Sequence, residues 1–135
     1  GITLTTETTL TIQSILYTGT ATRCPGIRFI WSHGGGTAPY ITGRLGAAIG
    51  PDGKPNANMA ALQKFYYDTA QAFNEYTLPT FTKVVPNSHI LFGTDYPFAQ
   101  AGTVAKALAD YRFAAADLRA IERDNALELF PRLRT

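Results

Sequence analysis

The sequence predicts an α/β fold built from parallel βα units. Three apolar segments, at 27–33, 65–70 and 89–95, have the length of buried strands. Phe29, Ile30 and Trp31 make the first of them apolar on both faces, which is typical of parallel rather than antiparallel strands. Helical segments separate the strands, as expected for βα units. We therefore expect the order α-β-α-β-α-β-α-α, without an internal linker.

Apolar residues at helical spacing predict the helices. The first helix has one apolar face and begins at Thr5 or Thr6, and that face consists of Ile12, Ile15, Leu16 and Gly19. A second helix follows Pro39, with a face of Ile41, Leu45, Ala48 and Ile49. Further helices are expected over 59–64, 101–111 and 117–130, and over 74–85, where Pro79 must kink or shorten the helix.

Composition and charge exclude several classes of protein. The 135 residues suffice for one domain, and they are 45% hydrophobic and 16% charged with a net charge of +2. Because Lys and Arg do not cluster, we expect no nucleic-acid partner. No apolar run is long enough for a membrane span, and no secretory leader is expected. The single Cys24 predicts no internal disulfide, a buried position and a reducing, cytoplasmic setting.

Polar residues follow each predicted strand. The three strand ends read Ser32-His33, Asp68-Thr69 and Thr94-Asp95. The carboxyl ends of parallel strands meet at one edge of a sheet, so we expect His33, Asp68 and Asp95 in one pocket. Imidazole and carboxylate groups bind metals and transfer protons. The structural alternatives are a backbone hydrogen bond for His33, a cap for Asp95 and a turn or supporting role for Asp68.

Three other features, the glycine run, His89 and Asn125, give weaker indications of function. The run at 34–36 could hold an anion on its N–H groups, or simply form a tight βα turn. His89 begins its strand, at the opposite end from the predicted site, and is expected to be structural or exposed. Asn125 lies on an apolar helical face and is expected to cap a neighbouring loop.

Four motifs, in order, resemble the amidohydrolase-related superfamily. They are the SHGGG run at 32–36, the YYDT run at 66–69, the GTDYPF run at 93–98 and the NALELF run at 125–130. Their combination and spacing are similar to the branch that contains aminocarboxymuconate-semialdehyde decarboxylase and the aromatic-acid decarboxylases. This resemblance covers nearly the whole chain and implies the C-terminal three βα units of a metal-dependent (β/α)8 TIM barrel, with 1–135 belonging to one domain.

The resemblance implies a metal-dependent, non-oxidative decarboxylase of a small aromatic or unsaturated acid in the intact parent. Asp95 corresponds to the family's metal ligand and His33 to a catalytic histidine near the metal, which is zinc or manganese. No organic cofactor is implied, and the partner is a small carboxylic acid. A segment that in muconate-type members provides a substrate-binding Arg reads Gly50-Pro51-Asp52-Gly53-Lys54 here, which favours aromatic hydroxy acids.

The sequence also departs from a complete site of this kind. It has two histidines, neither in a His-x-His pair, and it begins at Gly1 rather than Met. We therefore expect a fragment that binds metal poorly by itself. We also expect that a homo-oligomer or missing sequence completes the barrel. A metal-dependent hydrolase of a lactone, ester or amide, or a non-catalytic fragment, are the alternative readings.

Overall fold

The computed structural model describes residues 1–134 and contains a three-stranded parallel sheet. The strands β1 (Ile30–Trp31), β2 (Tyr66–Asp68) and β3 (Ile90–Leu91) lie side by side in chain order. Trp31 pairs with Tyr67, and Tyr67 pairs with Ile90, so β2 is the central strand. The predicted α/β fold with parallel strands is confirmed, although the hydrogen-bonded strands are shorter than the apolar segments that predict them.

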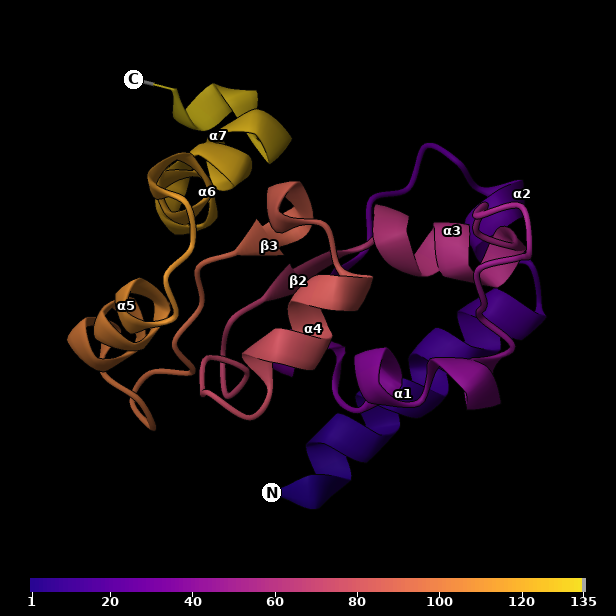
Figure 1. Cartoon of the computed structure of the whole chain (residues 1–135), viewed down its shortest axis with the longest axis horizontal. Helices are drawn as coiled ribbons and strands as arrows, with labels where there is room; N and C mark the ends of the chain where they lie inside the picture. The colour runs from indigo at the N-terminus through magenta and orange to yellow at the C-terminus, as the bar shows by residue number, and fades with distance from the viewer. Residues whose placement is uncertain (135) are drawn as a thin grey trace.

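Helices connect the strands and flank them (Figure 1). In chain order they are α1 (Ile2–Tyr17), α2 (Thr20–Arg23), α3 (Ala57–Lys64), α4 (Leu78–Val84), α5 (Ala101–Asp110), α6 (Ala115–Arg119) and α7 (Asn125–Leu129). The first three lie to one side of the strands and the last three to the other. Within residues 1–134, none of the helices has the length and apolar character that crossing a membrane requires.

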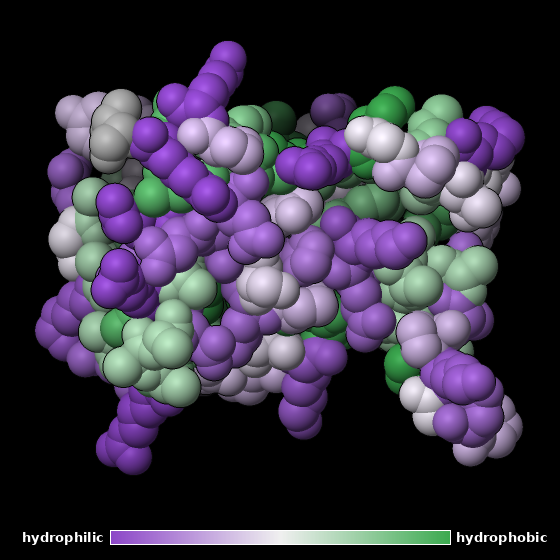
Figure 2. Space-filling view, turned by 90° about the horizontal axis from the view of Figure 1, so that it is seen from above, coloured by the Kyte–Doolittle hydropathy of each residue, from purple (hydrophilic) through white to green (hydrophobic). Residues whose placement is uncertain are grey.

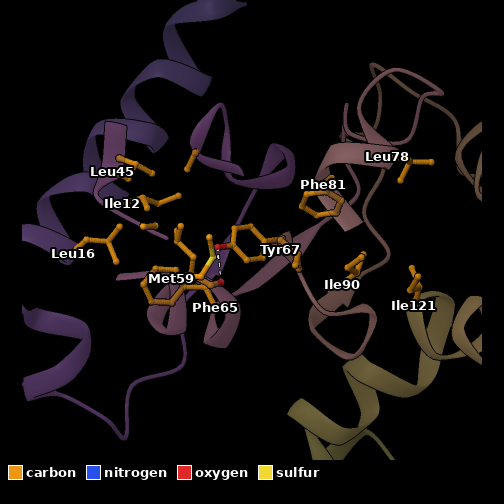
Figure 3. Packing of buried hydrophobic residues seen from close by; sticks show 14 of the residues in the cluster. Ile12, Leu16, Leu45, Met59, Phe65, Tyr67, Leu78, Phe81, Ile90 and Ile121 are labelled. Carbon is orange, nitrogen blue, oxygen red and sulfur yellow. Dashed lines mark hydrogen bonds between the residues drawn. The ribbon is translucent and has the colours of Figure 1, made fainter. Parts of the chain in front are cut away.

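The core lies between one face of the sheet and the helices (Figure 3). Tyr67 of β2 is fully buried, and its ring meets Phe81 of α4 edge-on at a centroid distance of 5.9 Å. The Tyr67 hydroxyl donates to the Leu62 carbonyl at 2.8 Å, so this polar atom is satisfied inside the core. Burial of these apolar side chains determines which face of the sheet packs against the helices.

The opposite face of the sheet is more open. Ile30, which the sequence predicts to be buried, is 44% exposed. It lies on β1 at the edge of the sheet, where residues 1–134 leave its side chain open to solvent. Figure 2 shows a face of the molecule on which apolar residues lie in recesses between hydrophilic side chains.

The helix expected after Pro39 does not form. Short 3-10 turns, η2 (Ala38–Tyr40) and η3 (Thr42–Leu45), replace it, and Ile41 and Ile49 are exposed. Two glycines explain the difference, since Gly46 ends η3 in a left-handed conformation and Gly43 weakens helical propensity. Leu45 is the member of the predicted face that is buried beside the core.

One helix boundary and the burial of Cys24 differ from expectation. Helix α1 begins at Ile2, and the hydroxyls of Thr5 and Thr6 donate to the Ile2 carbonyl instead of capping the helix. Helix α4 begins at Leu78, so the predicted segment is shortened rather than kinked, and Pro79 falls in its first turn, where it needs no N–H partner. Cys24 is half-buried at the end of α2 rather than in the core.

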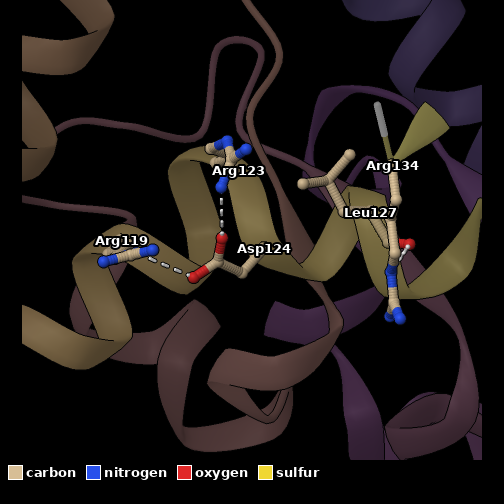
Figure 4. A network of polar contacts seen from close by, with 5 residues as sticks. All are labelled: Arg119, Arg123, Asp124, Leu127 and Arg134. Carbon is tan, nitrogen blue, oxygen red and sulfur yellow. Dashed lines mark hydrogen bonds and ion pairs between the residues drawn. The ribbon is translucent and has the colours of Figure 1, made fainter. Parts of the chain in front are cut away.

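The C-terminal helical segment is continuous but changes its winding. A π-helical turn, η5 (Ala120–Asp124), joins α6 to α7. Asp124 in this turn lies 3.0 Å from Nε of Arg119 and 3.3 Å from Nη1 of Arg123, and Arg134 donates to the Leu127 carbonyl (Figure 4). Exposed ion pairs of this kind contribute little to the stability of the fold. Burial of Ile121 against the core therefore holds the segment in place.

Candidate functional site

His33 and Asp95 meet at the carboxyl edge of the sheet. His33 opens the turn η1 (His33–Gly35) directly after β1, and Asp95 follows β3. Nε2 of His33 lies 3.4 Å from Oδ2 of Asp95, and the two side chains are 19% and 30% exposed. Both line a cavity of about 550 Å³, together with Gly1, Ile2, Leu4, Thr5, Gln71 and Phe98. The predicted proximity of the two residues is confirmed, whereas their chemical roles stay predictions.

The backbone around this cavity is unusual. His33, Gln71 and Asp95 all have a left-handed conformation, with φ of 53°, 57° and 62°. Only one other non-glycine residue in the described chain, Arg112, has a positive φ. Such conformations cost about 1–3 kcal/mol each and concentrate at functional sites, where surrounding structure holds them in place. The local strain therefore marks the same cavity as the polar side chains do.

The glycine run after His33 forms a tight turn packed against three other parts of the fold. All three glycines have positive φ. A Cβ on Gly34 would lie 2.7 Å from Ala72, on Gly35 2.6 Å from the Tyr67 ring, and on Gly36 2.2 Å from the Thr5 carbonyl oxygen. The N–H groups of Gly35 and Gly36 donate to Ser32 and His33 within the turn. The structure thus favours the tight-turn reading over an anion site.

Asp68 lies beneath the His33 turn and does not line the cavity. Its carboxylate accepts the N–H of Ala70 at 3.1 Å. Burial raises the pKa of Asp68, and the backbone N–H groups of Ala70, His33 and Gly34 and the charge of His33 partly offset that rise. The prediction that Asp68 shares one pocket with His33 and Asp95 is therefore wrong, because its carboxylate is taken up by the backbone next to the turn instead of facing the cavity.

Sequence reasoning did not single out Thr69, Gln71 or Phe98. Thr69 is fully buried, and its hydroxyl donates to the Gly93 carbonyl at 2.8 Å and accepts the Gly93 N–H at 3.0 Å. Its place in the YYDT motif, beside Asp68 at a strand end, is the signal that could have identified it. Phe98, which also lines the cavity, has a comparable signal as the last residue of the GTDYPF motif, whereas Gln71 has none.

The two polar residues expected to be structural lie away from the cavity. His89 precedes β3 at the opposite end of the sheet, with its ring centroid 4.6 Å from that of Tyr66. Burial lowers the pKa of His89, and Glu128 partly opposes that shift. Asn125 is buried and donates to the carbonyls of Asn87 and Ile90, both at 2.8 Å. Its predicted role as a cap for a neighbouring loop is confirmed.

A second cavity, of about 430 Å³, lies at the His89 end of the sheet. Its polar side chains are those of Thr22, Arg28, Lys64, Tyr66 and His89, and no carboxylate lines it. It therefore lacks the paired imidazole and carboxylate found at the other end. Across residues 1–134, no group of three or more His, Cys, Asp and Glu side chains is arranged to hold a metal ion. The His33–Asp95 pair is thus a two-donor set.

The sequence profile of the amidohydrolase family matches residues 1–132. The chain belongs to the amidohydrolase family. It is 34% identical over 145 residues to a 6-methylsalicylic acid decarboxylase of Aspergillus aculeatus, covering 95% of this chain and 43% of that protein. The predicted family resemblance, and its aromatic-acid decarboxylase branch, are confirmed.

Solved structures of amidohydrolase-fold decarboxylases share this fold. A dihydroxybenzoic acid decarboxylase from Polaromonas, crystallised with manganese and 2-nitroresorcinol, superposes with a TM-score of 0.80 at 24% identity. That match covers 97% of this chain and 42% of the other. A 2,6-dihydroxybenzoate decarboxylase from Rhizobium gives 0.78 at 25% identity, with 94% and 42% covered. The chain thus spans less than half the length of the amidohydrolase relatives that it matches.

Proposed function

We propose that this chain is the C-terminal three βα units of a (β/α)8 barrel and belongs to a metal-dependent, non-oxidative decarboxylase of a small aromatic hydroxy acid. The observation that carries the proposal is the His33–Asp95 pair, 3.4 Å apart at the carboxyl edge of a parallel sheet. In barrel enzymes this edge holds the active site. The relationship to a 6-methylsalicylic acid decarboxylase supplies the reaction class.

Asp95 is assigned two roles, as a metal ligand and as the group that transfers a proton. The reaction replaces the carboxylate on a ring carbon with hydrogen: a proton is added to that carbon, the C–C bond breaks, and its electron pair returns to the ring as carbon dioxide leaves. A carboxyl group at a partly exposed position can deliver this proton. Nε2 of His33 is close enough to orient Asp95 and to exchange the proton with it.

The two side chains fit a divalent cation as part of a larger donor set. Imidazole nitrogen and carboxylate oxygen are both ligands of zinc and manganese, but catalytic metal sites usually have three protein ligands. The remaining ligands would come from residues outside those described here, in the part of the barrel that relatives carry. A bound cation would neutralise and orient the substrate carboxylate.

The cavity suits an aromatic acid. Phe98, Ile2 and Leu4 give it apolar walls beside the polar pair, and its volume of about 550 Å³ lies in the range of small-molecule sites. The segment 50–54 lacks Arg, which counts against a muconate-type substrate. Its relatives include a 6-methylsalicylic acid decarboxylase and a 2,6-dihydroxybenzoate decarboxylase, which are named for acids with a single aromatic ring.

The decisive experiment measures carbon dioxide release by the intact protein, loaded with zinc or with manganese. The substrates are 6-methylsalicylate, 2,6-dihydroxybenzoate and a panel of lactones, esters and amides. We expect turnover of one of the hydroxybenzoates and its loss on chelation. Hydrolysis of the panel without carbon dioxide release would replace the proposal with a hydrolase, and inactivity on every substrate in both metal forms would support a non-catalytic role.

A further inference from the structure

The central strand ends between the two strand ends that carry His33 and Asp95. β2 pairs with β1 on one side and with β3 on the other. Its last residue, Asp68, and the following Thr69 place their side chains on opposite faces, as successive residues of an extended chain do. Neither residue lines the cavity of the His33–Asp95 pair. Each is therefore placed to influence the pair through the backbone that it holds, although the Asp68 carboxyl also senses the charge of His33.

Thr69 attaches the end of β3 to the end of β2. Its hydroxyl both donates to and accepts from the backbone of Gly93, at 2.8 Å and 3.0 Å, while its own N–H donates to the Leu91 carbonyl at 3.0 Å. Gly93 lies two residues before Asp95. Because Thr69 is fully buried, water cannot replace these bonds. They determine where the chain that leads to Asp95 begins.

Asp68 fills the space between the His33 turn and the end of β3. A Cβ on Gly93 would lie 2.8 Å from Cβ of Asp68 and 3.0 Å from its Oδ2, so the carboxylate packs directly against the Gly93 backbone. On its other side β2, which ends at Asp68, contacts the turn η1, and the backbone N–H groups of His33 and Gly34 lower the pKa of this carboxyl group. These amides belong to the first two residues of the turn, which both have a left-handed backbone conformation. A non-glycine residue such as His33 seldom adopts this conformation.

We propose that Asp68 and Thr69 are positioning residues that together set the separation of His33 and Asp95. Thr69 fixes the Asp95 side through Gly93, and Asp68 fixes the His33 side through the amides of the turn. As far as it concerns turnover, this inference rests on the proposed decarboxylase function. It assigns to the YYDT motif a role distinct from metal binding or proton transfer.

The test uses the intact protein and two pairs of variants. Thr69→Val keeps the shape but loses the hydroxyl, and Thr69→Ser restores it; Asp68→Ala removes both acceptor oxygens, and Asp68→Asn keeps one. We expect Val and Ala to lower kcat by about 10–100-fold with little change in KM, as for groups that support catalytic residues. Ser and Asn should stay within about threefold of the parent protein.

A double-mutant cycle separates positioning from general loss of stability. Asp68 acts through His33, so Asp68→Ala should lose most of its effect on kcat in a His33→Asn background, whereas Thr69→Val should keep its effect there. Two control variants alter similar bonds elsewhere: Asp52→Ala, whose carboxylate accepts the Lys54 N–H at 3.1 Å, and Thr82→Val, whose hydroxyl bonds to Leu78. We expect both controls to leave kcat unchanged.

Nuclear magnetic resonance of the histidine rings tests the same inference without relying on turnover. The His33 signal, identified by its loss in His33→Asn, should shift in Asp68→Ala and return toward its original position in Asp68→Asn, with His89 unmoved. Unchanged His33 signals and kcat in Asp68→Ala, equal shifts of both histidines, or additive kinetic effects would overturn the inference. If no substrate turns over, the His33 signal still decides the role of Asp68.

Discussion

His33 and Asp95 occupy different strand ends yet share a left-handed backbone, with φ of 53° and 62°, and their side chains face each other across 3.4 Å. A left-handed backbone is strained at a non-glycine residue, so each of the two conformations costs free energy. Contacts in the neighbouring segments offset this cost: the packed glycines after His33, and the Thr69–Gly93 hydrogen bonds before Asp95. The pair is therefore held in advance of any ligand.

Replacing the two residues of the pair should have unequal effects on turnover. We expect Asp95→Asn to abolish carbon dioxide release in the intact protein, because the amide cannot act as an acid and loses the charge that holds a metal. His33→Asn should cost about 10²–10⁴-fold, the scale of general acid–base assistance. Carbon dioxide release and metal content of both variants check this. An Asp95→Asn protein that keeps its metal and most of its activity would refute the proton-transfer role.

Gly35→Ala should destabilise the fold. Gly35 has a φ of 77°, and a Cβ there would lie 2.6 Å from the buried Tyr67 ring. We expect a loss of about 2 kcal/mol or more in the free energy of unfolding, from strain and overlap together. Gly43→Ala is the control, because nothing lies within 4 Å of its Cβ position, and it should be neutral or slightly stabilising. Urea unfolding compares the two, and equal midpoints would contradict the expectation.

Asn125→Leu should weaken the attachment of the C-terminal helices to the sheet. The substitution removes the buried amide that donates to the carbonyls of Asn87 and Ile90, and leaves the Asn87 carbonyl with the Ile90 N–H. A loss of about 1–3 kcal/mol in unfolding free energy is expected. Asn58→Leu, which removes one half-buried bond to the Leu45 carbonyl, should cost less. The thermal midpoints of the two variants provide the comparison, and the reverse order would show that Asn125 contributes little.

Acid should destabilise the protein partly through His89. Burial lowers the pKa of folded His89 below its ordinary 6.5, so the unfolded chain takes up this proton first as the pH falls. The unfolding free energy therefore declines as the pH falls through 6.5, and this contribution levels off below the folded pKa. His89→Gln should flatten the decline. Glu128→Gln should steepen it, since Glu128 raises the pKa of His89; urea unfolding across this pH range tests both.

The strand positions and the His33–Asp95 pair could be predicted because they depend on local patterns. Apolar runs locate the strands, and parallel strands bring their carboxyl ends together whatever the connecting segments do. The expected helix after Pro39 failed for the opposite reason. Its apolar residues have helical spacing, but Gly43 and Gly46 favour tight turns, and Leu45 is the only one of the four apolar residues that is buried in the core.

Thr69 and the exposure of Ile30 were beyond local reasoning. The Thr69 hydroxyl matters because Gly93 of another strand lies beside it, a contact that no spacing within the YYDT motif specifies. Ile30 has the composition of a buried residue, but it is 44% exposed on the edge strand of the described chain. Both features depend on which segments become neighbours in space.

The apolar residues that line the cavity tolerate substitution better than the residues that support the His33–Asp95 pair. Ile2, Leu4 and Phe98 line the cavity but are exposed, so their side chains contribute little to the packed interior. The glycine turn and Thr69, which support His33 and Asp95 from outside the cavity, are confined by close contacts. Substitutions at Ile2, Leu4 and Phe98 can therefore change the surface of the cavity without disturbing that support, which makes those three positions the natural choice for a randomised library aimed at new substrates.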